Sequence, residues 1–364
     1  MDSRYSFLVV ALTLGCASGI KFTHVLGVSP DGQRLLVGTG QELELREIES
    51  RQRSWHESVE SYWLDAPNTM VEWSQDGAYF AIAEEHFSSS LRGHYAVWQR
   101  ATGHRISPVY RMVGLGGTML TPIAVSNDGR WFAADGPHGL RVYDNVSGAA
   151  VLEVPDSDPH FSPDAQSLAT NHHLFELQGA AWATMAELPR PVDRPIIGFL
   201  GTQRVWVGPR LALATENRVE IWKDKQPVQF LGTRGVVRLA ASEHLLAIIE
   251  PVQPAEFKYL GHAERLTIYE PETGKERFAR SDLGAELQIV FRGDRIFVLA
   301  FGDRFEAFIL ELDGRTGKAL RSVELGAFDL MNSSHPELLP EAYYFSLNDY
   351  PERYAAVYTR LEFY

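Results

Sequence analysis

The chain has a single cysteine, Cys16, among its 364 residues. One thiol excludes an intrachain disulfide and a zinc site built from cysteine ligands. The sequence also has no block of consecutive lysines or arginines, and its 47 acidic residues exceed its 34 basic residues to give a net charge of −13. An acidic protein repels the phosphate backbone, so nucleic acid is not expected among the partners.

Motifs that carry chemistry are missing as well. The sequence has no Gly-x-Ser-x-Gly nucleophile elbow, no His-Glu-x-x-His zinc motif and no phosphate-binding loop with its lysine. The most ligand-like clusters are His172-His173 and Glu84-Glu85-His86. Neighbouring residues of a strand point to opposite faces, so we interpret both clusters as exposed loop residues rather than metal ligands. We therefore expect no catalytic residue, no cofactor and no metal.

No hydrophobic run is long enough to cross a membrane as a helix. The apolar run at residues 7–15 is short, follows Arg4, and precedes Cys16 and three small residues. This arrangement is typical of a secretory signal peptide. The sequence thus predicts a signal peptide of the lipoprotein type at residues 1–15, a short tether at residues 16–22 and a single domain at residues 23–364.

The residues before the cysteine carry a more specific signal. Thr13-Leu14-Gly15-Cys16 resembles the lipobox of bacterial lipoproteins, although leucine is more usual where Thr13 stands. The resemblance implies that Cys16 is lipidated and that the protein is anchored to a membrane of the bacterial cell envelope, on the periplasmic side or in the outer membrane. Two alternatives stay open: a cleaved signal without lipid, and an uncleaved apolar first strand of a cytoplasmic protein.

A short turn motif recurs along the chain. Its copies are Ser29-Pro30-Asp31-Gly32, Ser74-Gln75-Asp76-Gly77 and Ser126-Asn127-Asp128-Gly129, and residues 162–165 repeat it with alanine in the last place. The Asp carboxylate accepts hydrogen bonds from the backbone one or two residues on, and the glycine takes a positive φ. Each copy lies between segments rich in β-branched and aromatic residues, so each predicts the corner of a β-hairpin.

Each corner belongs to a unit of four strand-like runs. In the third unit these runs cover residues 122–126, 130–134, 139–144 and 149–154. Corner positions recur at spacings of 36 to 55 residues, which bracket the roughly 40–45 residues of a four-stranded propeller blade. Eight corner signals are present, and the last unit, at residues 343–363, is incomplete. The sequence predicts an all-β fold, a seven- or eight-bladed β-propeller with four-stranded antiparallel blades.

These repeats resemble the WD-repeat and YVTN-type β-propellers over nearly all of the chain after residue 22. The resemblance rests on the corners, on third-strand ends such as Val97-Trp98, and on Thr-Gly turns such as Thr102-Gly103. The Gly-His dipeptide of the WD-repeat family is missing, and Trp-Asp is replaced, for example by Trp98-Gln99. The resemblance implies a ring that closes by pairing strands from the two ends of the chain, with residues 17–24 as a candidate closing strand.

Loop lengths point to one face of the propeller. Long links between second and third strands are predicted at residues 84–94, 250–264 and 301–306. In a propeller these links share a face with the links between blades, whereas the corners and Thr-Gly turns lie on the opposite face. Loops on a rigid scaffold concentrate binding residues. The candidate contacts are Phe87, Arg92, His94, Phe257, Tyr259 and His262.

Together these features favour a non-enzymatic scaffold that binds another protein or a peptide on the looped face. The alternative is an enzyme or small-ligand sensor with its site at the mouth of the central channel. Channel-facing His, Arg, Asp or Glu side chains from three or more first strands would support that alternative, and a channel filled with apolar side chains would count against it. Glu72, His160 and Arg238 lie on or beside predicted first strands.

Overall fold

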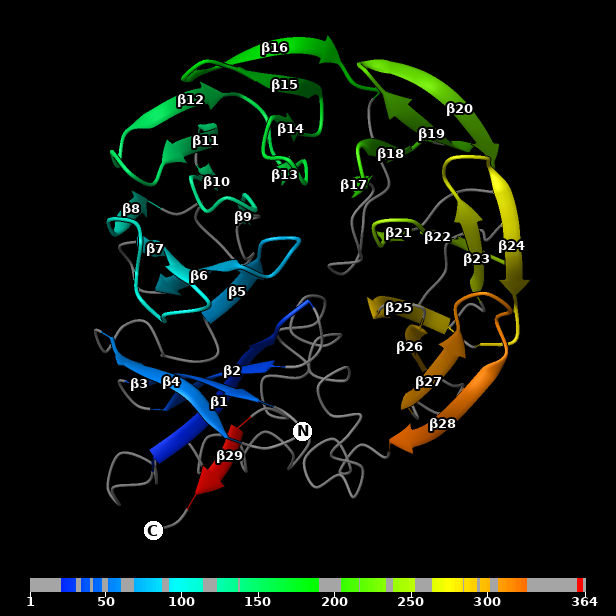
Figure 1. Ribbon diagram of the computed structural model, residues 1–364, viewed down its shortest axis with the longest axis horizontal. Helices are drawn as coiled ribbons and strands as arrows, with labels where there is room; N and C mark the ends of the chain where they lie inside the picture. Colours follow the sequence, from blue (N-terminus) through cyan, green and yellow to red (C-terminus); the bar gives the residue numbers. More distant parts are fainter. Residues whose placement is uncertain are drawn as a thin grey trace, which may run out of the picture.

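The strands of the protein form a ring of antiparallel sheets (Figure 1). The computed structural model describes residues 21–30, 34–39, 42–47, 52–59, 69–86, 92–113, 123–136, 138–189, 204–215, 217–233, 238–252, 264–283, 285–292, 295–301, 307–325 and 359–362. In these ranges the regular structure is entirely β-strand, and it makes seven sheets, six of four strands and one of five. The predicted all-β fold of four-stranded antiparallel blades is confirmed.

The first four blades cover the N-terminal half of the chain. Blade 1 contains β1 (Lys21–Val28), β2 (Arg34–Thr39), β3 (Glu42–Glu47), β4 (Arg53–Ser58) and β29 (Thr359–Glu362). Blade 2 contains β5 (Thr69–Trp73), β6 (Tyr79–His86), β7 (Arg92–Gln99) and β8 (Tyr110–Val113). Blade 3 contains β9 (Ile123–Val125), β10 (Trp131–Gly136), β11 (Gly139–Asp144) and β12 (Ala150–Val154). Blade 4 contains β13 (His160–Phe161), β14 (Ser167–Ala169), β15 (His173–Gln178) and β16 (Ala181–Glu187).

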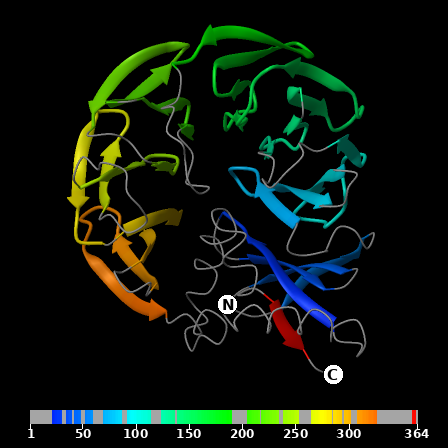
Figure 2. The ribbon, with the colours of Figure 1, turned by 180° about the vertical axis from the view of Figure 1, so that it is seen from behind.

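Blades 5 to 7 cover the C-terminal half of the described chain. Blade 5 contains β17 (Arg204–Val207), β18 (Arg210–Ala214), β19 (Arg218–Lys223) and β20 (Gln226–Gly232). Blade 6 contains β21 (Arg238–Ala241), β22 (Leu246–Pro251), β23 (Glu264–Glu270) and β24 (Lys275–Arg280). Blade 7 contains β25 (Ala285–Arg292), β26 (Arg295–Phe301), β27 (Ala307–Asp313) and β28 (Ala319–Leu325). In blades 2 to 7 the first strand lies nearest the centre of the ring and the fourth lies at its rim, whereas in blade 1 β29 lies at the sheet edge beyond β1 (Figures 1 and 2).

The corner turns form as the motif predicts. In blade 2 the Ser74 hydroxyl donates to Oδ1 of Asp76 at 2.7 Å, and the same oxygen accepts the backbone N–H of Ala78 at 2.9 Å. Gly77 has a φ of +66°. Blade 4 keeps the same turn although Ala165 replaces glycine, and Ala165 takes a φ of +57°. The side-chain hydrogen bonds of the corner therefore hold the turn even where an alanine must adopt the left-handed conformation.

Replacing Gly129 by alanine at the blade 3 corner is expected to destabilise the protein by about 1–3 kcal/mol. Gly129 has a φ of +69°, and an added Cβ would lie 2.4 Å from Cε1 of Tyr79 in blade 2. Urea unfolding followed by tryptophan fluorescence measures the loss. Gly179→Ala is the matched control, because Gly179 has a φ of +68° with nothing within 4 Å of its added Cβ. Equal losses in the two variants would contradict the expected clash.

Apolar residues from adjacent blades pack together and form the core. One cluster joins Leu36, Leu43 and Leu45 of blade 1 to Trp73 and Phe80 of blade 2. Burial of such side chains is the main favourable contribution to folding. Tryptophans also take part in these clusters, at positions 55, 73, 131, 182 and 206.

The two ends of the described chain meet in blade 1. Strand β29 pairs antiparallel with β1, with Lys21 opposite Glu362 and His24 opposite Thr359. The expected pairing of terminal strands is therefore confirmed. The last predicted repeat unit contributes this fifth strand of blade 1, and its two other predicted runs lie outside the described residues.

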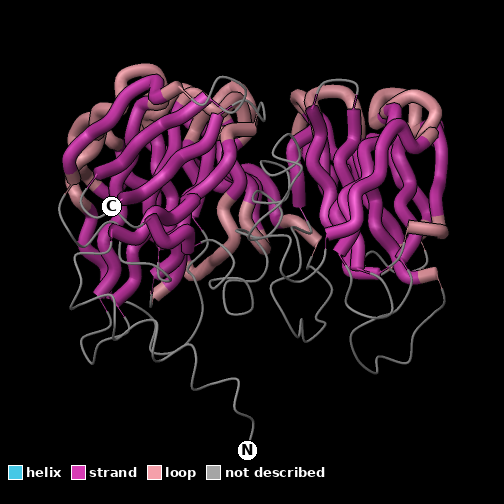
Figure 3. The backbone as a smooth tube through the Cα atoms, turned by 90° about the horizontal axis from the view of Figure 1, so that it is seen from below, coloured by secondary structure: helices cyan, strands magenta, loops and turns pink. Residues whose placement is uncertain are grey.

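The strands run between two faces of the ring (Figure 3). We call the face with the links between blades and the turns between second and third strands the link face, and the opposite one the corner face. The predicted link at residues 84–94 is shorter than expected, because β6 continues to His86 and β7 begins at Arg92. No helix in the described residues is long and apolar enough to cross a membrane.

Candidate functional site

Polar side chains gather on the link face of blades 3 to 5. They come from the end of β10, the link between β12 and β13, the turn between β14 and β15, and the first residue of β17. We call this set, with Glu72 of β5, the polar cluster: Glu72, Asp135, Asp156, Asp158, His160, Thr170, Asn171, His172, His173 and Arg204. Most of these residues lie at strand ends because antiparallel strands of a blade begin and end alternately on the two faces.

Asp156 is the centre of the hydrogen bonding. Its side chain is fully buried, and its two oxygens lie 3.0 Å from Nδ1 of His172 and 2.7 Å from Nδ1 of His173. The Thr170 hydroxyl donates to Oδ2 at 2.5 Å, and the backbone N–H of Ser157 donates to Oδ1 at 2.9 Å. Burial alone would raise the pKa of Asp156, but these hydrogen bonds outweigh it and lower the pKa.

Arg204 holds the turn of blade 4 against blade 5. It is only 2% exposed, and its guanidinium donates to Oδ1 of Asn171 at 2.7 Å and to the backbone carbonyls of Asn171 and Pro189 at 2.5 and 3.2 Å. Asn171 in turn donates its amide to the Ser157 hydroxyl at 2.6 Å. The link between blades 3 and 4 and the turn of blade 4 are therefore fixed to each other and to the neighbouring blade.

Asp158 and His160 form an ion pair at the inner end of the cluster. Nε2 of His160 lies 3.1 Å from Oδ1 of Asp158. Burial would raise the pKa of Asp158, but the charge of His160 and its hydrogen bond lower it. Burial would lower the pKa of His160, but Asp158 raises it. The backbone of Asp158 has a φ of +59°, a strained conformation that the surrounding hydrogen bonds maintain.

Two further carboxyl groups are desolvated beside this pair. Asp135 is 7% exposed, and its Oδ2 accepts the backbone N–H of Asp158 at 3.3 Å. Its Oδ1 is buried and has no hydrogen-bond donor within the described part of the chain. Desolvation raises the pKa of Asp135 to about 7. Desolvation likewise raises the pKa of Glu72 to about 7, although the charge of His160 acts in the opposite direction.

This arrangement holds its polar groups in a network of mutual hydrogen bonds. Both histidines at the turn are directed to Asp156, and Thr170 donates to the same carboxylate. Among the residues that the structure describes, no group of three or more His, Cys, Asp or Glu could hold a metal ion. The geometry is suited to binding, because the polar groups are held in place before a ligand arrives.

The structure changes the interpretation of several predicted site residues. Arg92 and His94 lie in strand β7, where His94 is opposite Glu84 and Arg111, and not in a loop as expected. Phe87, Phe257, Tyr259, His262 and the lipidation candidate Cys16 lie outside the described residues. The two histidines at positions 172 and 173 are not simply exposed loop residues. His172 lies in a turn, so both rings can reach Asp156.

The sequence analysis did not identify the acidic residues of the cluster. Asp156 and Asp158 belong to the segment Pro155-Asp156-Ser157-Asp158-Pro159, whose two prolines bracket a short interblade link. Because links between blades lie on the face where binding was expected, this link could have been recognised from the sequence as a candidate site. Of the three inner-strand residues predicted to bear on an enzyme site, Glu72 and His160 interact electrostatically. Arg238 forms a separate ion pair with Glu264 at 2.6 Å in blade 6.

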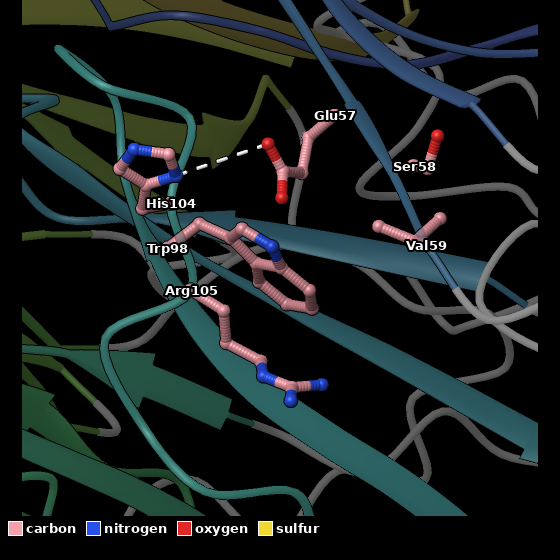
Figure 4. Close-up of a pocket in the computed structure, with 6 residues that line it drawn as sticks. All are labelled: Glu57, Ser58, Val59, Trp98, His104 and Arg105. Atoms are coloured by element: carbon pink, nitrogen blue, oxygen red, sulfur yellow. Dashed lines mark ion pairs between the residues drawn. The ribbon is translucent and has the colours of Figure 1, made fainter.

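A second surface feature lies at the rim of blades 1 and 2. It is an open hollow of about 570 Å³ lined by Glu57, Ser58, Val59, Trp98, His104 and Arg105 (Figure 4). An ion pair between Glu57 and His104 crosses it at 3.8 Å, and His104 is largely exposed. Exposed pairs of this kind contribute little energy, so the hollow is a weaker candidate than the polar cluster.

Comparisons with known proteins agree on the fold. No protein-family model and no curated protein matches the chain. Its structure is similar to that of the uncharacterized protein lmo1340 from Listeria monocytogenes EGD-e, with a TM-score of 0.52 and 12% identity over 84% of this chain and 95% of that one. It is also similar to Sqt1 from Saccharomyces cerevisiae, with a TM-score of 0.51 and 10% identity over 82% of this chain and 84% of that one. At such low identity the similarity concerns the fold alone, which is that of a β-propeller.

Proposed function

We propose that this protein is a non-enzymatic β-propeller scaffold that binds another protein or a peptide on its link face. The observation that carries this proposal is the polar cluster, in which side chains from blades 3 to 5 are fixed by mutual hydrogen bonds on that face. A surface held in one conformation loses little entropy on binding, which favours recognition. No reaction is implied by the arrangement, because its polar groups bond to each other rather than converge on a reacting atom.

Site-specific photocrosslinking tests this proposal. A photoreactive amino acid at His138 probes the link face, and the same amino acid at Val146 probes the corner face. Both positions are exposed and flank the same strand, β11, and Val146 is 85% exposed. We expect a discrete crosslinked protein from position 138 and none from position 146, in cells that naturally make the protein. The same crosslinks from both positions, or none from position 138, would argue against the link face as the binding surface.

A small-ligand site near the inner strands is the second candidate function. Charged residues occur on the first strands of several blades, among them Glu72 on β5, His160 on β13, Arg204 on β17 and Arg238 on β21. Side chains of this kind from three or more first strands are what an enzyme or sensor at the channel mouth requires if they face the channel. Arg204 and Arg238 already have protein partners, which favours a structural role for these two residues.

We also propose that a single seven-bladed domain spans residues 23–364 and that the protein is exported to the bacterial cell envelope and anchored there by lipid on Cys16. Seven described sheets and the β1–β29 pairing support the blade number. The lipobox-like residues before Cys16 support the anchor.

Replacing Cys16 by serine is expected to abolish palmitate labelling and to release the protein from the membrane fraction. The protein has one cysteine, so no other thiol can take the lipid. Radiolabelled palmitate and cell fractionation measure the two effects, with Ser18→Ala as the control. Palmitate labelling that persists in Cys16→Ser, or a wild-type protein that takes no label, would reject the lipid anchor.

A further inference from the structure

Two carboxyl groups of the polar cluster have no cationic hydrogen-bond or ion-pair partner among the described residues. Asp135 is more than nine-tenths buried, and its Oδ1 accepts no hydrogen bond in the described ranges. Glu72 is half-buried and forms no hydrogen bond or ion pair with a described residue. A desolvated carboxylate without a partner is costly, and such groups occur where a ligand supplies the missing charge.

The cations already present in the cluster are used elsewhere. His160 is paired with Asp158, and Arg204 donates to Asn171 and to the carbonyl of Pro189 rather than to a carboxylate. The charges of Asp158 and His160 act on both Glu72 and Asp135, so the ion pair lies within electrostatic reach of both carboxyl groups. Among the described residues, Glu72, Asp135 and Asp158 share the charge of His160, and Asp158 also that of Arg204, so negative charge stays in excess.

We propose that Glu72, Asp135 and Asp158 form a subsite for one cationic side chain, a lysine or an arginine, of the protein that docks on the link face. This inference rests on the proposed scaffold function and adds the chemistry of its partner. Glu72 and Asp158 are partly exposed and can be contacted directly, whereas Asp135 is buried and acts through its charge. An ammonium or guanidinium carries three to five N–H donors and can satisfy several carboxylate oxygens at once.

Binding of a cation at this position would be coupled to the release of protons from the carboxyl groups. Glu72 and Asp135 each have a pKa of about 7, so each is partly protonated near neutral pH, and a bound cation favours the ionised form. Affinity should therefore rise between pH 6 and pH 8, with release of protons on binding. The other charged groups that act on these carboxyls are Asp156, Asp158 and His160, and loss of the proton from His160 would act in the same direction.

The test uses fluorescein-labelled Gly-Lys-Gly and Gly-Arg-Gly peptides, with Gly-acetyl-Lys-Gly and Gly-citrulline-Gly as neutral counterparts. Fluorescence anisotropy with the full chain measures their affinities. We expect the charged peptides to bind about tenfold more tightly than the neutral ones. The double variant Glu72→Gln/Asp135→Asn should lose this preference and its increase from pH 6 to pH 8. His160→Gln should keep both, because the two carboxyl groups remain.

The matched control removes negative charge elsewhere. Glu243 and Glu276 are exposed and lie in blade 6, so Glu243→Gln/Glu276→Gln removes at least as much negative charge without touching the subsite. Equal loss of binding in both double variants would show attraction to the acidic protein as a whole and would overturn the subsite, as would equal binding of charged and neutral peptides. If the double variant does not fold, Glu72→Gln alone serves, because Glu72 has no hydrogen-bond partner in the described residues. Absence of the crosslink from position 138 would reject the scaffold, whereas a crosslink without charge preference would reject the subsite alone.

Discussion

Replacement of Asp156 by alanine is expected to destabilise the folded protein by about 3 kcal/mol. The buried carboxylate accepts hydrogen bonds from Thr170, His172, His173 and the backbone N–H of Ser157. Removing it leaves the buried Thr170 hydroxyl with fewer partners and frees both imidazoles from the turn. Urea unfolding at neutral pH measures the change, and the slope of the unfolding transition reports whether unfolding stays two-state.

Asp313→Ala is the matched control for this variant. Asp313 also caps a turn, accepting the backbone N–H groups of Arg315 and Thr316 and the Thr316 hydroxyl, but these hydrogen bonds are exposed to water. Water can replace them, so the loss should be about 1 kcal/mol or less. A loss in Asp156→Ala no larger than in Asp313→Ala would contradict the central role assigned to Asp156.

The pH dependence gives a second signature of Asp156. Its pKa is lowered in the folded protein, so it contributes stability above its unfolded pKa, and that stability is lost as the pH falls through the folded pKa. The Asp156→Ala variant should therefore lose less stability than the wild type between pH 5 and pH 3. Circular dichroism at these pH values follows the difference.

Asp135→Asn is expected to stabilise the protein above pH 7 by up to about 4 kcal/mol, the upper limit set by roughly 1.4 kcal/mol for each pKa unit. The pKa of Asp135 is about 7 in the folded protein because desolvation disfavours the charged form, against 3.8 for an unperturbed aspartic acid. The folded state therefore binds a proton more tightly than the unfolded state. The contribution of Asp135 to stability is highest at low pH, declines as the pH rises from about 4 to about 7, and stays reduced above that range.

Thermal unfolding at pH 5 and pH 8 measures this effect. At pH 5 Asp135 is protonated in the folded protein but ionised in the unfolded chain, so the variant should already be the more stable protein. At pH 8 its advantage over the wild type should be larger. Glu72 and His160 also make the wild type less stable as the pH rises, since the pKa of each is raised in the folded state. Glu243→Gln, at an exposed corner, should leave the decline unchanged, and a wild type equally stable at both pH values would refute the desolvation of Asp135.

The strands and corners could be predicted because they depend on interactions between near neighbours. Ser74, Asp76 and Gly77 form one turn through hydrogen bonds that span at most five residues. Alternation of apolar residues along each run then determined which faces pack between blades. Ala165 follows the same logic, because the Ser162 and Asp164 side chains still form the corner that glycine forms elsewhere.

The polar cluster could not be predicted in the same way. His173 lies 17 residues from Asp156, Arg204 lies 33 residues from Asn171, and Glu72 belongs to a blade two positions earlier in the ring than His160. These groups meet only because the blades are arranged around a centre. The two adjacent histidines bind one carboxylate because the turn between β14 and β15 ends between them. The alternation of residues along a strand does not predict strand boundaries to within one residue.

The sequence by itself determined the blades of this propeller, their corners and the apolar surfaces between them, since local hydrogen bonds and side-chain alternation are encoded within a few residues. The tertiary structure decided that the first and last described strands share blade 1 and that charged residues from blades 2 to 5 form one cluster. It also decided the charge of that cluster. The desolvation of Asp135 and Glu72 depends on how the blades pack around them, so it cannot be predicted from any single segment of the chain.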